Sequence, residues 1–196
     1  MNSKNLLLII ILGAILVLGG CACNGYNSMV KLDENVKNKW ANVQSDYQRR
    51  ADLIPNLVNT VKGAANFETE TLTKLMEARA KATSVQVDPT NITPEKMAEF
   101  QQAQAGVSGA LGRLLAVVEN YPDLKASQNF RDLQAQLEGT ENRIKVSRND
   151  FNTAIQSYNS TVRTFPNNIF ANMFGFRVKE GFQSEPGAEK APEVKF

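Results

Sequence analysis

The chain has 196 residues and nearly balanced charge, with 22 lysines and arginines against 20 aspartates and glutamates, no histidine and two cysteines. The length suits one well-buried domain, and the scattered charge lacks the concentrated basic face that a nucleic-acid partner requires. Because both cysteines lie at the end of an N-terminal apolar run, the rest of the chain has no thiol or imidazole, which excludes Cys/His metal sites, Cys/His pairs and Ser-His-Asp triads there.

Residues 1–23 have the features of a membrane-targeting leader. One lysine precedes an apolar run from Leu6 to Leu18, which has about the length of a signal-peptide h-region and falls short of the roughly 20 residues of a spanning helix. The step Leu18-Gly19-Gly20-Cys21 resembles a bacterial lipobox, so we expect Cys21 to become the lipidated N-terminus of the mature protein. The alternative is an uncleaved single-pass anchor, in which the uncharged stretch from Leu6 to Cys23 spans the bilayer with tilt or local thinning.

The first part of the body is predicted to be one long amphipathic helix. Its apolar residues recur in steps of three and four, which keeps them on one side of a helix. They are Met29, Leu32, Val36, Trp40, Val43, Tyr47, Ala51, Ile54, Val58 and Val61. Pro55 lies inside this stripe without shifting it, so we expect a kink there and the helix end at Gly63-Ala64-Ala65. Trp40 continues the stripe, which predicts core packing.

Two more helices and a loop are predicted in the middle of the chain. Residues 67–83 resume helical character, with acids in the first turns and bases toward the end. Residues 84–93 form the clearest loop, and Thr93 is a predicted N-cap with Pro94 at the first helical position. The next apolar stripe runs from Met97 to Val118 and stops at Asn120-Tyr121-Pro122.

The last long helix is marked by apolar residues from Phe130 to Phe165, and Pro166 ends it. No segment alternates with period two for long enough to predict a strand, so the expected fold is an all-α, antiparallel helix bundle over residues 26–182. Residues 183–196 have the composition of a disordered tail. Large apolar side chains crowd the stretch after Pro166, which either caps the bundle, docks on a partner or lies on a bilayer, and we favour capping. They are Ile169, Phe170, Met173, Phe174, Phe176 and Phe182.

Two stretches, YNSMVKLDENVKNKWANVQSDYQRRADLIPNLVNTVKG and ENRIKVSRNDFNTAIQSYNSTVRTFPNNIFANMFGF, closely resemble the LemA family of bacterial membrane-associated proteins. The match covers about residues 26–176, and residues 48–57 are its most specific part. The resemblance implies a four-helix bundle behind an N-terminal membrane segment and, for most members, no established biochemical activity. Members often carry an aromatic residue and a histidine after the Lys-Gly step, where this chain has Ala65 and Phe67. A leader that ends in cysteine is similar to a lipoprotein variant of the family.

Arg49, Arg50 and Asp52, next to Pro55, form the candidate interaction surface. A helix-interior proline frees the carbonyl four residues back, here that of Ala51, and two arginines one turn away could bind a carboxylate, a phosphate or a lipid head group. The alternative, which we favour, is that the arginines pair with acids on a neighbouring helix and that the kink lets the stripe follow a curved core.

The expected function is that of a membrane-tethered, non-enzymatic scaffold or interaction protein of the cell envelope, with a protein partner of unknown identity. We expect no catalytic residues, no metal or cofactor and no nucleic-acid partner, because no motif provides the chemistry. The alternative is a helical binding module for a lipid or a small amphiphile. A deep apolar pocket between the helices would favour the binding module, and a solid core would favour the scaffold.

Overall fold

The computed structural model describes residues 3–63 and 67–183, and these form an all-α bundle without a strand. The predicted all-α class is therefore confirmed. The helices are α1 (Ser3–Lys62), α2 (Thr69–Ser84), α3 (Pro94–Val118), α4 (Pro122–Ala126), α5 (Gln128–Arg163) and α6 (Asn167–Phe174).

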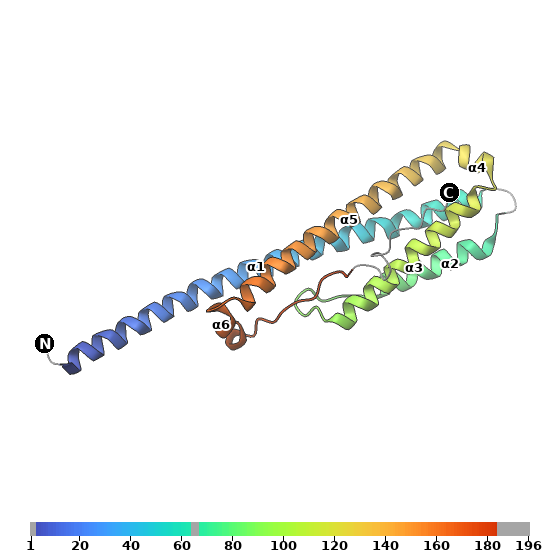
Figure 1. Ribbon diagram of the computed structural model, residues 1–196. Coiled ribbons are helices and arrows are strands. Elements are labelled where there is room, and N and C mark those ends of the chain that lie inside the picture. The colour runs from blue at the N-terminus through green and yellow to red at the C-terminus, as the bar shows by residue number, and fades with distance from the viewer. Residues whose placement is uncertain (1–2, 64–66, 184–196) are drawn as a thin grey trace, which may run out of the picture.

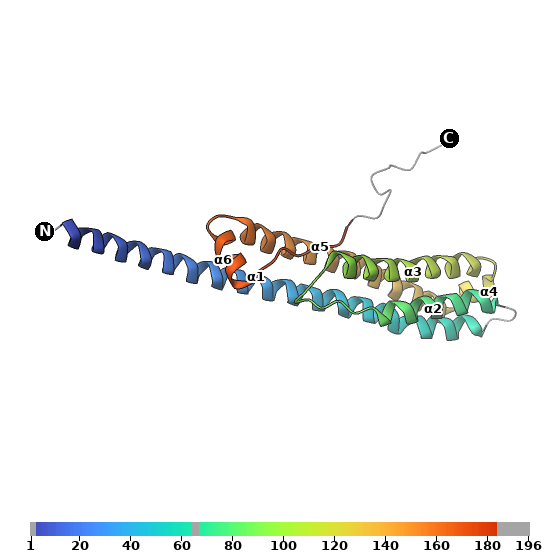
Figure 2. The same cartoon turned by 90° about the horizontal axis from the view of Figure 1, so that it is seen from below.

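The bundle is elongated and is built around α1 (Figure 1). The second half of α1 packs along antiparallel α5, and the α2–α3 hairpin covers this pair at the end far from the N-terminus (Figure 2). The 60 residues of α1 correspond to about 90 Å of helix, and its first part extends beyond all the other helices. Among the helices of residues 3–63 and 67–183, none is long and apolar enough to cross a membrane.

The end of α1 and the start of α3 lie at or next to the positions predicted from the sequence. The α1 helix continues through Pro55 and ends at Lys62, next to the predicted break, of which Ala64 and Ala65 lie outside the described residues. The Thr93 hydroxyl accepts a hydrogen bond from the Lys96 amide at 3.3 Å, and Pro94 opens α3 as expected.

The apolar side chains form two cores that follow each other along the bundle. The proximal core, nearer the N-terminus, is rich in aromatic rings, which are Trp40, Tyr47, Phe100, Phe151, Tyr158 and Phe182. The distal core is mainly aliphatic and is formed by residues such as Ile54, Leu57, Leu75, Leu114 and Leu137. Trp40 is fully buried, which confirms its predicted place in the core. Edge-on and tilted ring packing of this kind adds stabilisation beyond the buried area.

The stretch after Pro166 divides into a helix and an extended strap, residues 176–183. The strap returns over the proximal core and buries Phe182, while Phe170 and Phe176 also pack against that core. Ile169, Met173 and Phe174 of α6 remain exposed. The expected capping therefore holds for part of the stretch, because only some of its large apolar side chains face inward.

Candidate functional site

The most unusual buried side chain is Arg50, which is 2% exposed. Its Nη1 donates hydrogen bonds to Ser108 Oγ at 3.0 Å and to Glu141 Oε1 at 2.9 Å. Its Nη2 donates to the side-chain and backbone oxygens of Gln104, at 2.6 and 3.2 Å. The guanidinium carbon also lies 5.0 Å from the centre of the Tyr47 ring. One side chain of α1 thus joins α3 and α5.

Arginine suits this position because its planar head carries several donors in a fixed geometry and always keeps its charge. Burying that charge is costly unless it is paired and hydrogen-bonded. Glu141 provides the pairing charge from a side chain that is itself 44% exposed, so the ion pair reaches from the bundle interior to its surface. Along α1, Arg50 separates Tyr47 of the proximal core from Leu53 of the distal core.

Two open clefts flank the Arg50 side chain. One, of about 530 Å³, lies between α1, α2, the loop before α3 and α3, and it includes Arg79, Gln86 and Phe100. The other, of about 550 Å³, lies between α1, α3 and α5 and includes Gln101 and Arg148. Tyr47, Arg50 and Gln104 line both clefts. Since amide, guanidinium and apolar groups mix on these walls, neither cleft is the deep apolar pocket that would favour an amphiphile-binding module.

The carbonyl freed by Pro55 has a partner. Arg79 of α2 donates its Nε–H to the Ala51 oxygen at 2.7 Å, which replaces the backbone hydrogen bond that a proline cannot make. Arg49 and Asp52 are exposed, and Asp52 accepts a hydrogen bond from Gln48 at 2.7 Å. The four residues of the predicted surface therefore do not converge on one point: Arg50 lies inside the bundle, and Arg49 and Asp52 lie at its surface.

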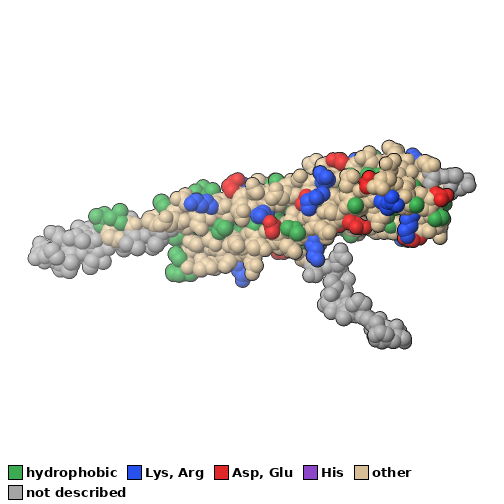
Figure 3. Space-filling model, turned by 90° about the horizontal axis from the view of Figure 1, so that it is seen from above, with side chains coloured by type: hydrophobic (Ala, Val, Ile, Leu, Met, Phe, Trp, Pro, Cys, Tyr) green, Lys and Arg blue, Asp and Glu red, His purple; other side chains and the backbone are tan. Residues whose placement is uncertain are grey.

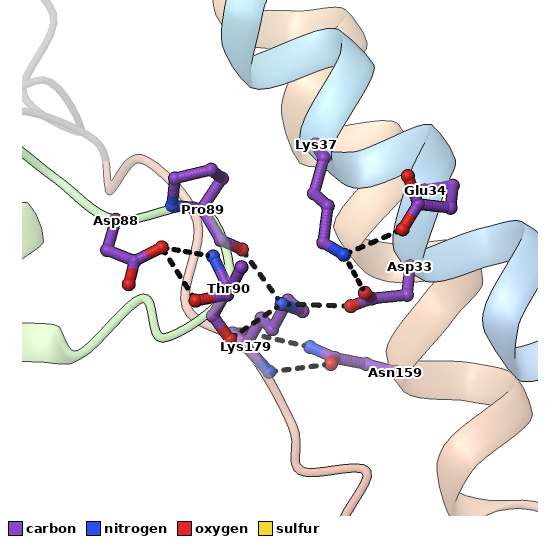
Figure 4. Close-up of polar contacts among 8 residues, drawn as sticks. All are labelled: Asp33, Glu34, Lys37, Asp88, Pro89, Thr90, Asn159 and Lys179. Atoms are coloured by element: carbon purple, nitrogen blue, oxygen red, sulfur yellow. Dashed lines mark hydrogen bonds and ion pairs between the residues drawn. The ribbon is translucent and has the colours of Figure 1, made fainter.

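A second polar cluster surrounds Lys179 of the strap, a buried lysine that sequence analysis did not single out (Figure 4). Its Nζ lies 3.0 Å from Asp33 Oδ1 of α1 and donates to the carbonyl oxygen of Pro89 at 3.0 Å. Burial opposes ionisation of Asp33, but hydrogen bonds from Lys37 and Lys179 outweigh it and hold the pKa of that carboxyl below its usual value. The cluster joins α1, the loop before α3 and the strap.

Two asparagines of α5 hold the strap by its backbone. Asn159 bonds both the N–H and the carbonyl of Lys179, each at 2.8 Å. Asn152 does the same for Phe182, at 2.8 Å for the N–H and 3.0 Å for the carbonyl. Seven residues of helix span about 10.5 Å, and three residues of extended chain span about 10 Å, so the two spacings match. A Cβ at Gly181 would come within 2.6 Å of Asn152 Oδ1, which explains a glycine there.

The remaining sequence features to locate are possible metal ligands, the two cysteines and the predicted tail. Across residues 3–63 and 67–183, no three cysteine, aspartate or glutamate side chains are grouped so that they could hold a metal ion. Cys23 is an exposed free thiol, whereas the side chain of Cys21 and residues 184–196 of the predicted tail lie outside what the structure describes.

The fold and these clusters define a class: elongated antiparallel helix bundles whose buried polar groups tie one helix to another. The chain belongs to the LemA family, whose sequence profile matches residues 39–196, so the predicted family is confirmed. It is 28% identical over 181 residues to magnetosome protein MamQ 2 of Paramagnetospirillum magneticum, covering 84% of this chain and 66% of that protein. Protein LemA of Metamycoplasma hominis is 26% identical over 145 residues, 74% of this chain and 63% of that protein. The chain thus spans slightly less than two thirds of these relatives.

Proposed function

We propose that the protein is a membrane-tethered, non-enzymatic scaffold of the bacterial cell envelope. The observation that carries this proposal is the continuity of α1, which runs as one helix through Cys21, the expected lipid-attachment site, to Lys62 at the far end of the bundle. Because α1 packs along α5, the bundle is rigidly connected to the part of α1 that enters the membrane or carries the lipid. Two filled cores and fully partnered buried charges support a rigid body more than a reactive one.

The tether is tested by intact-mass analysis and carbonate extraction of the full chain from bacterial membranes. With lipidation at Cys21, Cys21→Ser leaves an unprocessed precursor, whereas the matched control Cys23→Ser is processed normally. A wild-type chain that keeps Met1 and carries no acyl groups would support the single-pass anchor instead. A chain that carbonate removes from the membrane would refute both forms of the tether.

The scaffold is tested separately, by replacing residues 1–24 with an unrelated lipoprotein leader and a flexible Gly-Ser linker. This variant keeps the bundle at the membrane and removes only the rigid connection. With a photoreactive residue in place of Val146, which is exposed on α5, we expect the native chain to give discrete cross-links to envelope proteins in cells. The flexible variant should lose them. Identical cross-links in both chains would refute a scaffold that works through α1.

A second candidate, a binding module for an anionic amphiphile, is favoured by one observation: the two clefts that meet at the Arg50 guanidinium. Arg79 lines the cleft between α1 and α2 and adds a second cation near Arg50. The probe is cis-parinaric acid titrated into the detergent-solubilised full chain. Saturable fluorescence that Arg79→Gln abolishes and Arg49→Gln leaves unchanged would support this function, and non-saturable binding would refute it.

A further inference from the structure

The α6 face is an exposed apolar surface that the bundle does not use. It consists of Phe165, Ile169, Met173, Phe174 and Tyr26 of α1. Phe165 is 75% exposed, Met173 66% and Ile169 57%. On α6 itself, Ala171 is buried and Phe170 packs against the proximal core, so the helix has apolar side chains on its inner and its outer side. A surface helix of a globular protein normally turns polar residues outward.

This face lies where α1 leaves the bundle, beside the leader (Figure 1, Figure 3). The Tyr26 ring contacts those of Phe174 and Phe176, with centres 5.0 and 5.7 Å apart. A Cβ at Gly25 would come within 2.5 Å of Asn167 Oδ1, so α6 approaches the α1 backbone closely. Tyr26 follows Cys21 by five residues, about 7.5 Å of helix. The polar layer of one bilayer leaflet is about 5 to 8 Å thick.

The two segments that carry the α6 face, residues 1–32 and 151–179, contain only positive charges, and the exposed Glu34 and Glu180 lie just beyond them. Neither residues 1–32 nor residues 151–179 contain an aspartate or a glutamate, although the chain has 20. Exposed cations are present in the same segments, at Lys31, Arg163 and Arg177. The nearest acid along α1, Asp33, is paired with Lys37 and Lys179. A surface that combines apolar side chains with cations and lacks carboxylates matches a membrane interface with anionic head groups.

We propose that the α6 face rests in the head-group layer of the membrane that holds the leader, as a second point of attachment. This inference depends on the tether of the proposed function, because the distance from Cys21 places the face at the right depth only when the leader is in the bilayer. The lipidated Cys21, or the uncleaved leader in the single-pass alternative, holds the chain at the membrane, and the α6 face sets the tilt of the bundle against it. Helices with such faces bury their apolar side about 5 to 10 Å into the interface.

The test places a tryptophan on the face and measures its contact with lipid. Trp40 is the only tryptophan, so Trp40→Phe removes the native tryptophan fluorescence. Met173→Trp is made in that background, and Val146→Trp is the matched control, since Val146 is similarly exposed but lies on α5 far from the leader. The full-length chains are reconstituted into vesicles of phosphatidylcholine and phosphatidylglycerol, with or without phosphatidylcholine brominated near the ester bond.

We expect the Met173→Trp chain to lose most of its emission in brominated vesicles and the Val146→Trp chain to keep it, while circular dichroism shows both chains folded. Flotation separates the two proposals: chains that do not float with the vesicles refute the tether and this inference together. If both chains float and brominated lipid quenches their emission equally, the inference alone is refuted. If brominated lipid does not quench the Met173→Trp chain, and a photoreactive residue at the same position cross-links to another protein, the α6 face belongs to a protein partner and the inference is also overturned.

Discussion

The two cores differ in the side chains that form them and in the segments that complete them. The distal core contains mainly aliphatic side chains from α1 to α5, with Phe130 as its buried ring, and loop residues such as Phe67 and Tyr121 pack at its edge. The proximal core contains six aromatic rings, and the extended strap closes it with Phe182, whose ring centre lies 5.7 Å from that of Phe151. In this bundle the aromatic core is completed by a short non-helical segment, whereas most of the distal core is formed by helices.

The difference also predicts that the two ends of the bundle differ in their stability against local opening. Helix pairs of the distal core can separate only by exposing whole apolar stripes, whereas the strap is held by Phe182, Lys179 and the hydrogen bonds of two asparagines. Segments with few buried contacts open first in native proteins. The proximal core is therefore expected to open locally by release of the strap, and Trp40, whose ring centre is 6.0 Å from that of Phe182, reports that opening.

The largest expected effect is that of Trp40→Ala, because it empties the centre of the proximal core. Removing a fully buried large aromatic side chain costs about 3 to 5 kcal/mol. Chemical unfolding followed by circular dichroism measures this loss. Val146→Ala is the control, with a change within about 0.5 kcal/mol expected at an exposed site. A cost for Trp40→Ala near that of the control would mean that the proximal core contributes little to folding.

Arg50 tests how the two cores are connected. Arg50→Ala leaves the side chain of Gln104 unpaired inside the bundle, which costs about 1 to 3 kcal/mol. Arg50→Met leaves the same polar groups without their partner but refills much of the lost volume, and the Glu141 carboxylate, which is 44% exposed, can be hydrated in its place. We therefore expect Arg50→Met to be clearly more stable than Arg50→Ala in thermal unfolding. Equal losses would show that the charge itself, rather than the filled space, holds α1 to α3 and α5.

Asn152→Ala tests the strap alone. It removes two hydrogen bonds to Phe182, and each is worth about 0.5 to 1.5 kcal/mol. We expect acrylamide to quench Trp40 more strongly in this variant, while hydrogen exchange in the distal helices stays unchanged. Asn149→Ala, at an exposed position of the same helix, is the control. Faster exchange throughout the bundle would show that strap release and global unfolding are one event.

The smallest effect is expected for Pro55→Ala, because the carbonyl that Pro55 frees already accepts a hydrogen bond from Arg79. The backbone N–H that this substitution introduces competes with Arg79 for the same oxygen, so stability should change by no more than about 1 kcal/mol. A double-mutant cycle measures the competition: Arg79→Ala should cost less in the Pro55→Ala background than in the wild type. Equal costs would mean that the two donors do not share the Ala51 carbonyl.

The sequence predicted the long helices that form both cores and did not predict the strap. Periodic stripes revealed the long helices, and the Thr93-Pro94 step and the break after Lys62 placed their ends, because these signals act within a few residues. The strap does not obey helical periodicity, and its contacts join residues such as Asn152 and Phe182 that no local pattern relates. The short helices α4 and α6 were likewise missed, since five and eight residues give too little periodicity.

The candidate site shows the same limit. The sequence singled out Pro55 because a proline interrupts an apolar stripe, and it singled out Arg50 with Arg49 and Asp52 because they lie beside it. It did not identify Arg79, which looks like an ordinary surface residue of an amphipathic helix, and it placed Gln104 in the apolar stripe of residues 97–118 without a partner for it. Lys179 was also missed, because in the sequence it lies between Arg177 and Glu180 like an ordinary surface lysine.

The unbroken course of α1 has a consequence for the direction in which the bundle faces. Each residue of an α-helix turns the chain by about 100° and advances it by about 1.5 Å. One residue added between Cys23 and Gly25 would therefore swing the whole bundle by about 100° around the helix axis while hardly changing its height. Seven added residues would bring it back to within about 20° of the original azimuth. The orientation of the bundle relative to the first part of α1 is thus set by the number of helical residues between them.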